Sequence, residues 1–345
     1  MGLTNFLRRV ALIAGLAAGW ALPGQAQEPH INIMTGSASG TYIQFGRDLQ
    51  NLMSGCGQVM GVVETAGSLE NFLGVRQRRF TQFGIVQNDV LEYMQTFASQ
   101  DPVIARTIQG VRIAFPLYDE EVHILARSDI ADFRGIDGKR VAIGVQDSGT
   151  FLTASLMLSL AGLEPSERLM IGPTEALDQL KAGNIDAFFY VAGAPAALYS
   201  QGDIDPAKFH LLPITDETLR SVYTPKALPA NTYAFQTQPV DLVSVKAVLM
   251  TYEYNPGSNA YHREACNAVA DLSSLILTNL DSLRESGHPK WKDVDLDAIP
   301  PGWDIGACVN RGIAPDYVAN CTPSGTPESD ANAAYRRSIC AVMGC

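Results

Sequence analysis

The sequence predicts an α/β fold built mainly on parallel sheet, and two observations lead to this prediction. Strand-like apolar runs alternate with helical ones along most of the chain, which is the pattern of parallel strands covered by helices. Two strand-turn-helix units of similar design, MTGSASGTYIQFG at 34–46 and GVQDSGTFLTASL at 144–156, lie about 110 residues apart. We therefore expect two similar lobes, although a single doubly wound domain also repeats such units.

The first 26 residues have the features of a secretion signal. Arg8 and Arg9 precede an apolar run at 10–22, and Gly24-Gln25-Ala26 offers a small-x-small cleavage site. The apolar run is shorter than the roughly 20 residues that a membrane-spanning helix needs. We expect residues 1–26 to be removed and the mature protein to be exported to the periplasm.

In the first half of the mature chain, short apolar runs predict strands at 31–34, 59–64 and 83–86. Helices should follow them. The first carries Tyr42, Phe45 and Leu49 on one face, the second covers 68–75, and the third is capped by Asn88 or Asp89. The apolar segment 111–126 is long enough for two strands, and we expect the sequence LYDEE inside it to interrupt them as a solvated turn.

The second half repeats this organisation. A strand is expected at 141–145, an almost uniformly apolar helix at 151–160, and another strand in GNIDAFFYVAGAPAALYS. A Pro-rich stretch after Tyr223 precedes an apolar segment at 240–254 and a helix at 265–283. The tail after Pro300 is rich in Gly, Pro, Asn and Cys, and we expect loops there.

The charge of the chain limits its partners. The 319 residues after position 26 include 36 acidic and 23 basic residues. A protein this acidic is a poor candidate for binding nucleic acid or an anionic membrane surface. Any anion that it binds must therefore be captured by local donors.

Six cysteines lie in the exported part of the chain, where an oxidising compartment allows disulfides. Up to three bridges are possible, and the sequence does not choose among the 15 pairings. There is no CxxC pair and only five histidines are present, so we expect neither a zinc site nor another metal or cofactor. The six are Cys56, Cys266, Cys308, Cys321, Cys340 and Cys345.

Hydroxyl and glycine residues gather where the predicted strands meet the following helices. At a helix N-terminus, the first backbone N–H groups have no partner within the helix, and the peptide dipoles add about half a positive charge. Glycine lets the backbone approach a ligand, while Ser and Thr supply further donors. The exits at 35–42, 67–68, 87–88, 148–150 and 193–195 could thus line one crevice and hold an anion. For any single exit an ordinary capped turn is the better explanation, whereas the five exits together favour the anion site.

An ordered set of segments resembles the TAXI-type solute-binding receptors of tripartite (TRAP) transporters. These segments are TGSASGTYIQFGRDL, GSLENFLGVRQRRFTQFGIVQNDV, LYDEEVHILARSDI, GKRVAIGVQDSGT and GNIDAFFYVAGAPA. The resemblance covers about 30–255 and implies the type II periplasmic-binding-protein fold, with two α/β lobes, crossing hinge strands and a ligand cleft. It implies a first lobe of 28–120 plus 245–345 and a second of 121–244.

The resemblance also implies a monomeric receptor that delivers a small carboxylate, glutamate or 2-oxoglutarate-like, to TRAP permease subunits. Two departures from the family pattern are the Ile43 that replaces a second aromatic residue and the Cys-rich tail that replaces a His-Pro-Gly-Ala-like segment. The ligand-binding residues carried over are Ser37, Gly40, Thr41, Tyr42, Ser68, Gln87, Ser148, Gly149, Thr150, Ala192 and Gly193.

Other interpretations remain open for several residues and for the function. Tyr42 also begins the apolar face of its helix. Glu64 and Asp147 fit solvated, capping or turn roles better than ligand contacts, and His123 fits a buried strand position better than a catalytic one. A sensor that feeds a membrane histidine kinase is the alternative function. An enzyme is disfavoured because no GxSxG nucleophile motif is present.

Overall fold

The computed structural model describes residues 30–97, 99–320, 334, 337–338 and 340. The predicted signal peptide, Cys321 and Cys345 lie outside them. The described strands form one sheet in the order β2-β1-β3-β10-β4-β7-β5-β6, with β8 paired to β4 and β9 to β10. The strands are β1 (Ile31–Met34), β2 (Met60–Val63), β3 (Thr81–Gln87), β4 (Val111–Arg127), β5 (Arg140–Ala142), β6 (Glu167–Leu169), β7 (Ala187–Ala192), β8 (Phe209–Leu211), β9 (Thr224–Leu228) and β10 (Val240–Tyr252).

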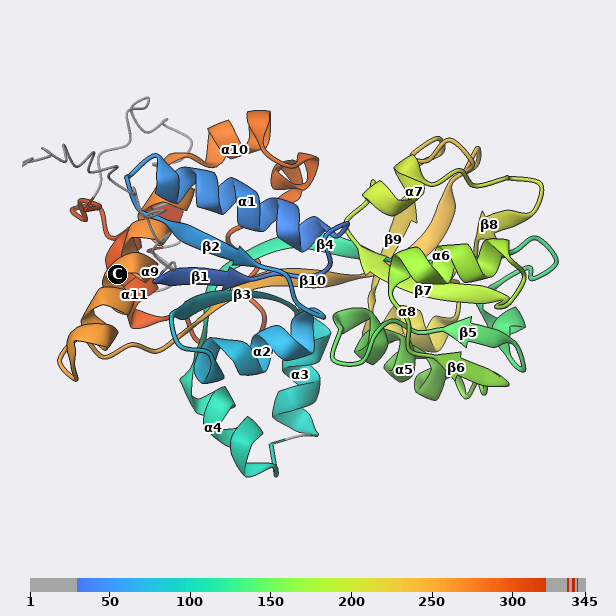
Figure 1. Cartoon of the computed structure of the whole chain (residues 1–345), viewed down its shortest axis with the longest axis horizontal. Coiled ribbons are helices and arrows are strands. Elements are labelled where there is room, and N and C mark those ends of the chain that lie inside the picture. Colours follow the sequence, from blue (N-terminus) through green and yellow to red (C-terminus); the bar gives the residue numbers. More distant parts are fainter. Residues whose placement is uncertain (1–29, 98, 321–333, 335–336, 339, 341–345) are drawn as a thin grey trace, which may run out of the picture.

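Lobe 1 contains the parallel strands β1, β2 and β3, with helices on both faces (Figure 1). One face is covered by α1 (Thr41–Ser54) and by the C-terminal helices α9 (Ala260–Thr278), α10 (Leu280–Ser286) and α11 (Ala307–Ile313), with the 3-10 helix η2 (Pro289–Asp293). The other is covered by α2 (Ser68–Gln77), α3 (Asn88–Thr96) and α4 (Pro102–Gly110). Each face has its own apolar core because both sides of a parallel sheet are buried.

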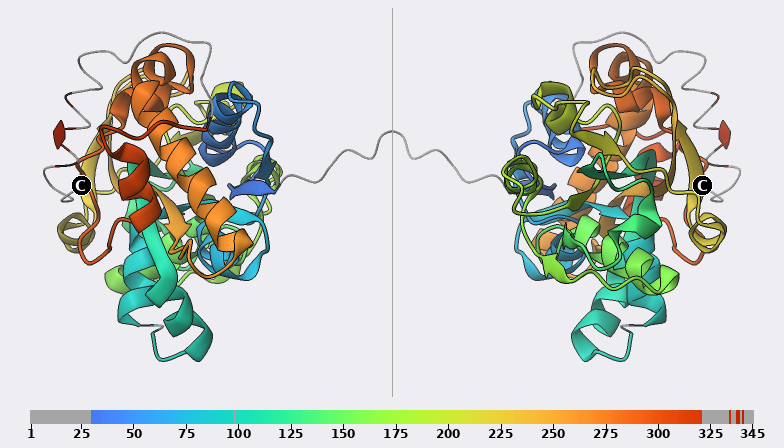
Figure 2. Two further views of the ribbon diagram at one scale, coloured as in Figure 1. Left: turned by 90° about the vertical axis from the view of Figure 1, so that its left-hand side faces the viewer. Right: turned by 90° about the vertical axis from the view of Figure 1, so that its right-hand side faces the viewer.

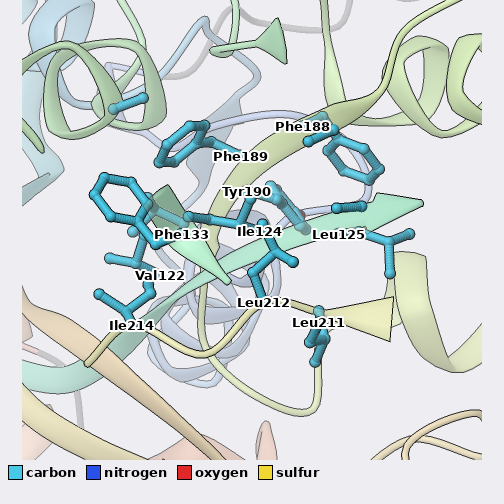
Figure 3. Close-up of a cluster of buried hydrophobic side chains, with 14 of the residues drawn as sticks. Val122, Ile124, Leu125, Phe133, Phe188, Phe189, Tyr190, Leu211, Leu212 and Ile214 are labelled. Atoms are coloured by element: carbon cyan, nitrogen blue, oxygen red, sulfur yellow. The ribbon is translucent and has the colours of Figure 1, made fainter. Parts of the chain in front are cut away.

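Lobe 2 contains β5, β6 and β7 in parallel, together with β8 and β9. Its core gathers aromatic and branched side chains from the second half of β4, from β7 and from the segments at 130–136 and 209–214; Figure 3 shows Phe133, Phe188, Phe189 and Tyr190 among them. Its helices are η1 (Phe133–Ile136), α5 (Gly149–Ala161), α6 (Pro173–Lys181), α7 (Ala197–Gln201) and α8 (Glu217–Val222).

Two long antiparallel strands, β4 and β10, run from one lobe into the other (Figure 1). The expectation of two strands separated by a solvated turn at LYDEE is wrong, because β4 is continuous through Asp119, Glu120 and Glu121. Glu120 and Glu121 are only 2% and 3% exposed. Pairing with β10 on one side and, from Glu121 onward, with β7 on the other keeps the segment extended.

The fold class predicted from the sequence is confirmed: two α/β lobes are joined by crossing strands, as in a type II periplasmic-binding protein. In the ladder between the two crossing strands, Glu120 pairs with Val245. The predicted lobe boundaries, 120/121 and 244/245, fall at this pair. That division of the chain remains a prediction.

The C-terminal part of lobe 1 contains more helix than expected. The predicted helix at 265–283 is two helices, α9 and α10, which meet at Asn279; its side-chain amide bonds the Leu275 carbonyl. Helix α9 begins earlier than predicted because the Asn259 side chain caps it. In the tail, where loops were expected, α11 packs beside α9 (Figure 2), and a disulfide between Cys266 and Cys308 joins them. Cys56 also forms a disulfide bond, and so does Cys340.

Candidate functional site

A cavity of about 270 Å³ lies between the lobes where β1, β2, β3, β5 and β7 end. Ligands of open α/β sheets are expected at the carboxyl ends of the strands. Residues from both lobes and from the crossing strand β4 form the walls. The lining residues are Gly36, Ser37, Gly40, Thr41, Tyr42, Glu64, Thr65, Ala66, Gly67, Ser68, Gln87, Glu120, Gly144, Val145, Ser148, Gly149, Thr150, Gly172, Pro173, Phe189, Tyr190, Val191 and Ala192.

The structure brings together ten of the eleven residues proposed as ligand contacts. The ten that line the cavity are Ser37, Gly40, Thr41, Tyr42, Ser68, Gln87, Ser148, Gly149, Thr150 and Ala192. Gly193 is not among the lining residues. It lies behind the wall, with its carbonyl oxygen 3.5 Å from Thr41 Oγ1. Their role in binding remains a proposal.

The N-terminus of α1 opens into the cavity without a side-chain cap. Gly40 is the N-cap residue, and having no side chain it cannot accept a hydrogen bond from the first turn. The first backbone N–H groups of α1 therefore remain available as donors, as they are at other anion-binding helix ends. Ser37 and Thr41 stand beside them in the cavity wall.

On the lobe 2 side, two hydroxyls hold the start of α5 in place. Ser148 Oγ accepts the Phe151 N–H at 3.0 Å and so caps the helix. Thr150 Oγ1 accepts the Val191 N–H at 3.2 Å, which ties α5 to β7. Each hydroxyl keeps its own proton to donate. Lobe 2 thus provides a second set of uncharged donors.

The N-terminus of α2 is occupied by the other lobe. The backbone N–H groups of Leu69 and Glu70 both donate to the Asp147 carbonyl at 3.2 Å. Asp147 has a φ of 67°, a left-handed conformation that Asp tolerates better than most residues. Asp147 is therefore a turn residue whose carbonyl caps a helix of lobe 1. These two donors of α2 point to Asp147.

A chain of hydrogen bonds leads from the end of β3 to Glu120. The Gln87 N–H donates to Ser68 Oγ at 3.2 Å, and Ser68 Oγ lies 3.4 Å from the Tyr42 hydroxyl. The Tyr42 hydroxyl donates to Glu120 Oε2 at 2.7 Å. Since Tyr42 uses its proton on Glu120, Ser68 donates to Tyr42. Every bond of the chain thus points toward Glu120.

Glu120 is the functional candidate that the sequence analysis placed wrongly. Burial raises the pKa of this carboxyl to about 8, and the neighbouring acids Glu121 and Asp89 add to the effect; hydrogen bonds from Tyr42 and Gln87 offset it only in part. A buried carboxyl that faces a cavity and has a pKa near neutral pH is typical of functional sites. Glu120 is hard to identify from the sequence, because an acidic run after an aromatic residue is also typical of a solvated turn.

Several contacts cross directly between the lobes. Thr153 of α5 donates to Asp89 Oδ2 of α3 at 2.6 Å and lies 3.3 Å from Gln87 Oε1. Gly149 fits so closely against lobe 1 that a Cβ atom there would lie 2.1 Å from Gln87 Oε1 and 2.7 Å from Ser68 Oγ. The lobes are therefore in contact around the cavity, which is the arrangement of a closed cleft.

A larger cavity of about 670 Å³ lies elsewhere between the lobes, bordered by α3, the end of α5, α8 and the crossing strands. It contains none of the eleven predicted contacts. The smaller cavity is the better candidate site, because hydrogen-bond donors converge there and converging polar groups indicate a binding site better than cavity volume does.

In the described part of the chain, no group of three His, Cys, Asp or Glu side chains is placed to hold a metal ion. Among the same residues, no helix is both long and apolar enough to cross a bilayer.

Comparisons with known proteins place the chain in a family. Among solved structures, it is similar to a periplasmic transporter (14% identity, TM-score 0.47, covering 74% of this chain and 87% of that one). It is also similar to the periplasmic binding protein BugD (11%, TM-score 0.46, 76% and 84%) and to a double mutant of the BvgS VFT2 domain from Bordetella pertussis (14%, TM-score 0.39, 71% and 91%). The model of the NMT1-like family matches residues 33–297, most of the chain, and the protein belongs to this family.

Proposed function

We propose that this protein is a periplasmic receptor that captures a small carboxylate and delivers it to the membrane permease of a TRAP transporter. The observation that supports this most is the convergence of ten predicted contacts on one cavity between two lobes. The cavity volume of about 270 Å³ lies near the lower limit of small-molecule sites. The segments that resemble TAXI-type receptors support a TRAP permease as the partner.

The ligand carboxylate is expected at the α1 and α5 end of the cavity. The uncapped α1 N-terminus and the hydroxyls of Ser148 and Thr150 lie there. At the Glu120 end, an ionised carboxyl about 6 Å from a ligand carboxylate would repel it by roughly 3 kcal/mol at an effective dielectric constant of about 20. Uncharged donors of both lobes thus hold the anion, and no lysine or arginine is among the described lining residues.

Capture couples to lobe closure because the donors belong to different lobes. A ligand that contacts both sets binds the closed form more tightly than the open one, and this difference alone can shift the population of lobe arrangements. The closed form would then dock on the permease. We propose binding without catalysis, and no histidine is among the described lining residues.

Ser37 offers a clean test of capture. Its hydroxyl lies in the cavity wall, whereas Ser148 also caps α5, so a change at Ser148 would mix binding with helix stability. We expect Ser37→Ala to weaken binding of L-glutamate or 2-oxoglutarate about fivefold or more by isothermal titration calorimetry, because one charge-assisted hydrogen bond is lost. Ser54→Ala, at the exposed far end of α1, should bind as the wild type does.

Equal affinity of both variants would remove the α1 end from the site. The carrier role is tested separately, by ligand uptake into proteoliposomes that contain the permease. Uptake that proceeds equally well without the receptor would contradict it.

A further inference from the structure

The cavity contains acidic side chains but no basic ones among its described lining residues. Glu120 is buried at the crossing-strand end, and Glu64 is exposed at its rim, where Glu64 Oε1 accepts the Ala38 N–H at 3.0 Å. A site for a purely anionic ligand has no need of a buried carboxyl in its wall. In its ionised form this carboxyl can face only a part of the ligand that is not an anion.

The hydrogen bonds at Glu120 are arranged so that its carboxyl accepts them. The chain from Gln87 through Ser68 to Tyr42 delivers a proton donor to Glu120 Oε2. The neighbouring acid Glu121 already has a cationic partner, because its Oε1 lies 2.8 Å from Lys290 Nζ. No cation of the described chain lies equally close to Glu120, so the ligand is the remaining source of one.

A second polar group of the cavity wall is open to a ligand. The hydroxyl of Tyr190 is buried, and within the described residues its polar neighbour is the Ser39 side chain, which does not reach full hydrogen-bond geometry. Tyr190 and Tyr118, another buried tyrosine, both interact electrostatically with Glu120. Buried polar groups are rarely left unpaired, and a ligand that reaches Glu120 can also pair with the Tyr190 hydroxyl.

We infer that Glu120 is the specificity-determining residue of the cavity, that it selects ligands carrying a primary amine as well as a carboxylate, and that binding the amine displaces the Glu120 proton. The inference rests on the proposed function, because it specifies the ligand class of the same site. It distinguishes a glutamate-like ligand from a 2-oxoglutarate-like one.

The proton balance of the binding step is simple. With a pKa of about 8, Glu120 is mostly protonated at pH 7 in the absence of a cation. A ligand ammonium, already carrying its own proton, stabilises the carboxylate form, and the Glu120 proton passes to the buffer. The titratable groups facing Glu120 are Tyr42 of α1, Tyr118 of β4, Tyr190 of β7 and the acids Asp89 and Glu121. The three tyrosine hydroxyls have pKa values raised by burial and stay neutral.

The alternative is that neutral Glu120 donates a hydrogen bond to a second carboxylate of the ligand. It predicts the opposite behaviour. No proton would be released, affinity would fall as pH rises above 8, and an amide in place of the carboxyl would still donate.

Matched pairs of ligands decide between these cases. Calorimetric titrations of the mature full chain would use L-glutamate with 2-oxoglutarate, L-alanine with pyruvate, and L-leucine with 4-methyl-2-oxopentanoate, each at pH 7 in phosphate and in Tris. We expect an amino acid to bind at least tenfold more tightly than its keto acid. The difference in heat between the two buffers should correspond to release of nearly one proton.

Glu120→Gln should lower the affinity for that amino acid at least tenfold, abolish proton release and leave the keto acid within about twofold. Glu92→Gln, an equal change at an exposed position outside the cavity, should retain wild-type affinity and proton release. A keto acid that binds as tightly as its amine partner, or amine binding without proton release, would overturn the inference and leave the proposed capture intact. Failure of all six compounds to bind would overturn both.

Discussion

Two neighbouring carboxyl groups on β4, those of Glu120 and Glu121, are buried but balanced in different ways. Glu121 pairs with Lys290 Nζ at 2.8 Å and accepts the Ala194 N–H at 2.7 Å. Glu120 receives a hydroxyl instead of a cation. Desolvation disfavours the charged form of an unpaired acid, so Glu121 serves the fold whereas Glu120 keeps a proton that a ligand can displace.

Glu120 should make the protein less stable as pH rises. Its pKa is about 8 in the folded chain and near 4.5 in the unfolded chain, so the folded state binds more protons between these values. Its contribution to stability is complete below pH 4.5 and lost as pH rises to 8, by up to about 1.4 kcal/mol per pH unit. We expect Glu120→Gln to remove this slope in urea unfolding at pH 5, 6.5 and 8.

The exposed control, Glu92→Gln, should retain the wild-type slope. Unfolding free energies of Glu120→Gln and wild type that run parallel across this pH range would show that Glu120 is ionised in the folded, ligand-free protein.

The Lys290–Glu121 pair predicts a large stability effect. Both side chains are 4% exposed, and removing one partner leaves the other charge buried without compensation. Lys290→Met should lower the unfolding free energy by about 3–5 kcal/mol, and adding Glu121→Gln should recover part of that loss. Lys292→Met, at an exposed position of the same 3-10 helix, should change it little. A double variant no more stable than Lys290→Met would argue against the buried charge as the cause.

Individual polar residues were the hardest part of the site to predict. The hydroxyl and glycine residues at 35–42 and 148–150 could be identified because their position between strand and helix has a local meaning. Glu120 and Glu121 could not, because their burial depends on Tyr42, 78 positions away, and on Lys290, 169 positions away. No local pattern reveals such partners, and a charged run is usually solvated.

At the scale of elements, α5 and α1 carry the opposing donor sets, and the close fit of Gly149 against Gln87 and Ser68 shows how tightly α5 approaches lobe 1. An added Cβ at Gly149 would lie 2.1 Å from Gln87 Oε1, and Thr153 Oγ1 already lies 3.3 Å from that oxygen. We expect Gly149→Ala to hold the lobes apart and weaken L-glutamate binding at least tenfold in calorimetry, with the unfolding free energy of the ligand-free protein nearly unchanged.

Gly55→Ala provides the comparison for that change. It replaces a glycine at the end of α1 whose backbone is already helical, and it should leave binding unaffected. Wild-type affinity in Gly149→Ala would show that closure tolerates the extra methyl group and that the cleft contacts at α5 do not limit binding.

The ends of an element could be predicted where they depend on capping residues and periodicity within the element itself. The helix predicted at 151–160 is α5, whose start is fixed by Ser148 and whose end is fixed by Gly162 in a left-handed conformation. The predictions were wrong where tertiary contacts decide the secondary structure. The crossing strand β4 is continuous because it pairs on both sides, and α11 forms beside α9, to which a disulfide joins it.

At the scale of the whole molecule, the lobes meet through a contact that depends on pH. Desolvation raises the pKa of Asp89 to about 6, although the hydrogen bond from Thr153 partly offsets it. Opening the lobes would hydrate Asp89 and return its pKa toward 3.8. The closed form therefore binds this proton more tightly, and raising pH through 6 favours opening.

This effect can be measured by small-angle X-ray scattering of the ligand-free protein. We expect the radius of gyration to increase between pH 5 and 8 and the increase to be smaller in Asp89→Asn. The charged groups nearby are Glu92 on the same helix and, across the cavity wall, Glu120, whose own titration acts in the same direction. A radius that is constant with pH would indicate that Asp89 stays buried or stays hydrated in both forms.

The two-lobe architecture was predictable because two similar strand-turn-helix units lie far apart in the chain, at 34–46 and 144–156. Their facing arrangement was not, since it depends on how β4 and β10 twist past each other.

The position of Glu120 on a crossing strand has a mechanical consequence. A residue near a pivot moves little when the lobes rotate, while the outer tips of both lobes sweep through a long arc. Rotation about the crossing strands would turn a small shift at the Glu120 carboxyl into a larger displacement at the outer ends of the lobes, which another protein could sense. Discrimination among ligands and the signal passed to a partner would then both depend on the hinge region around Glu120.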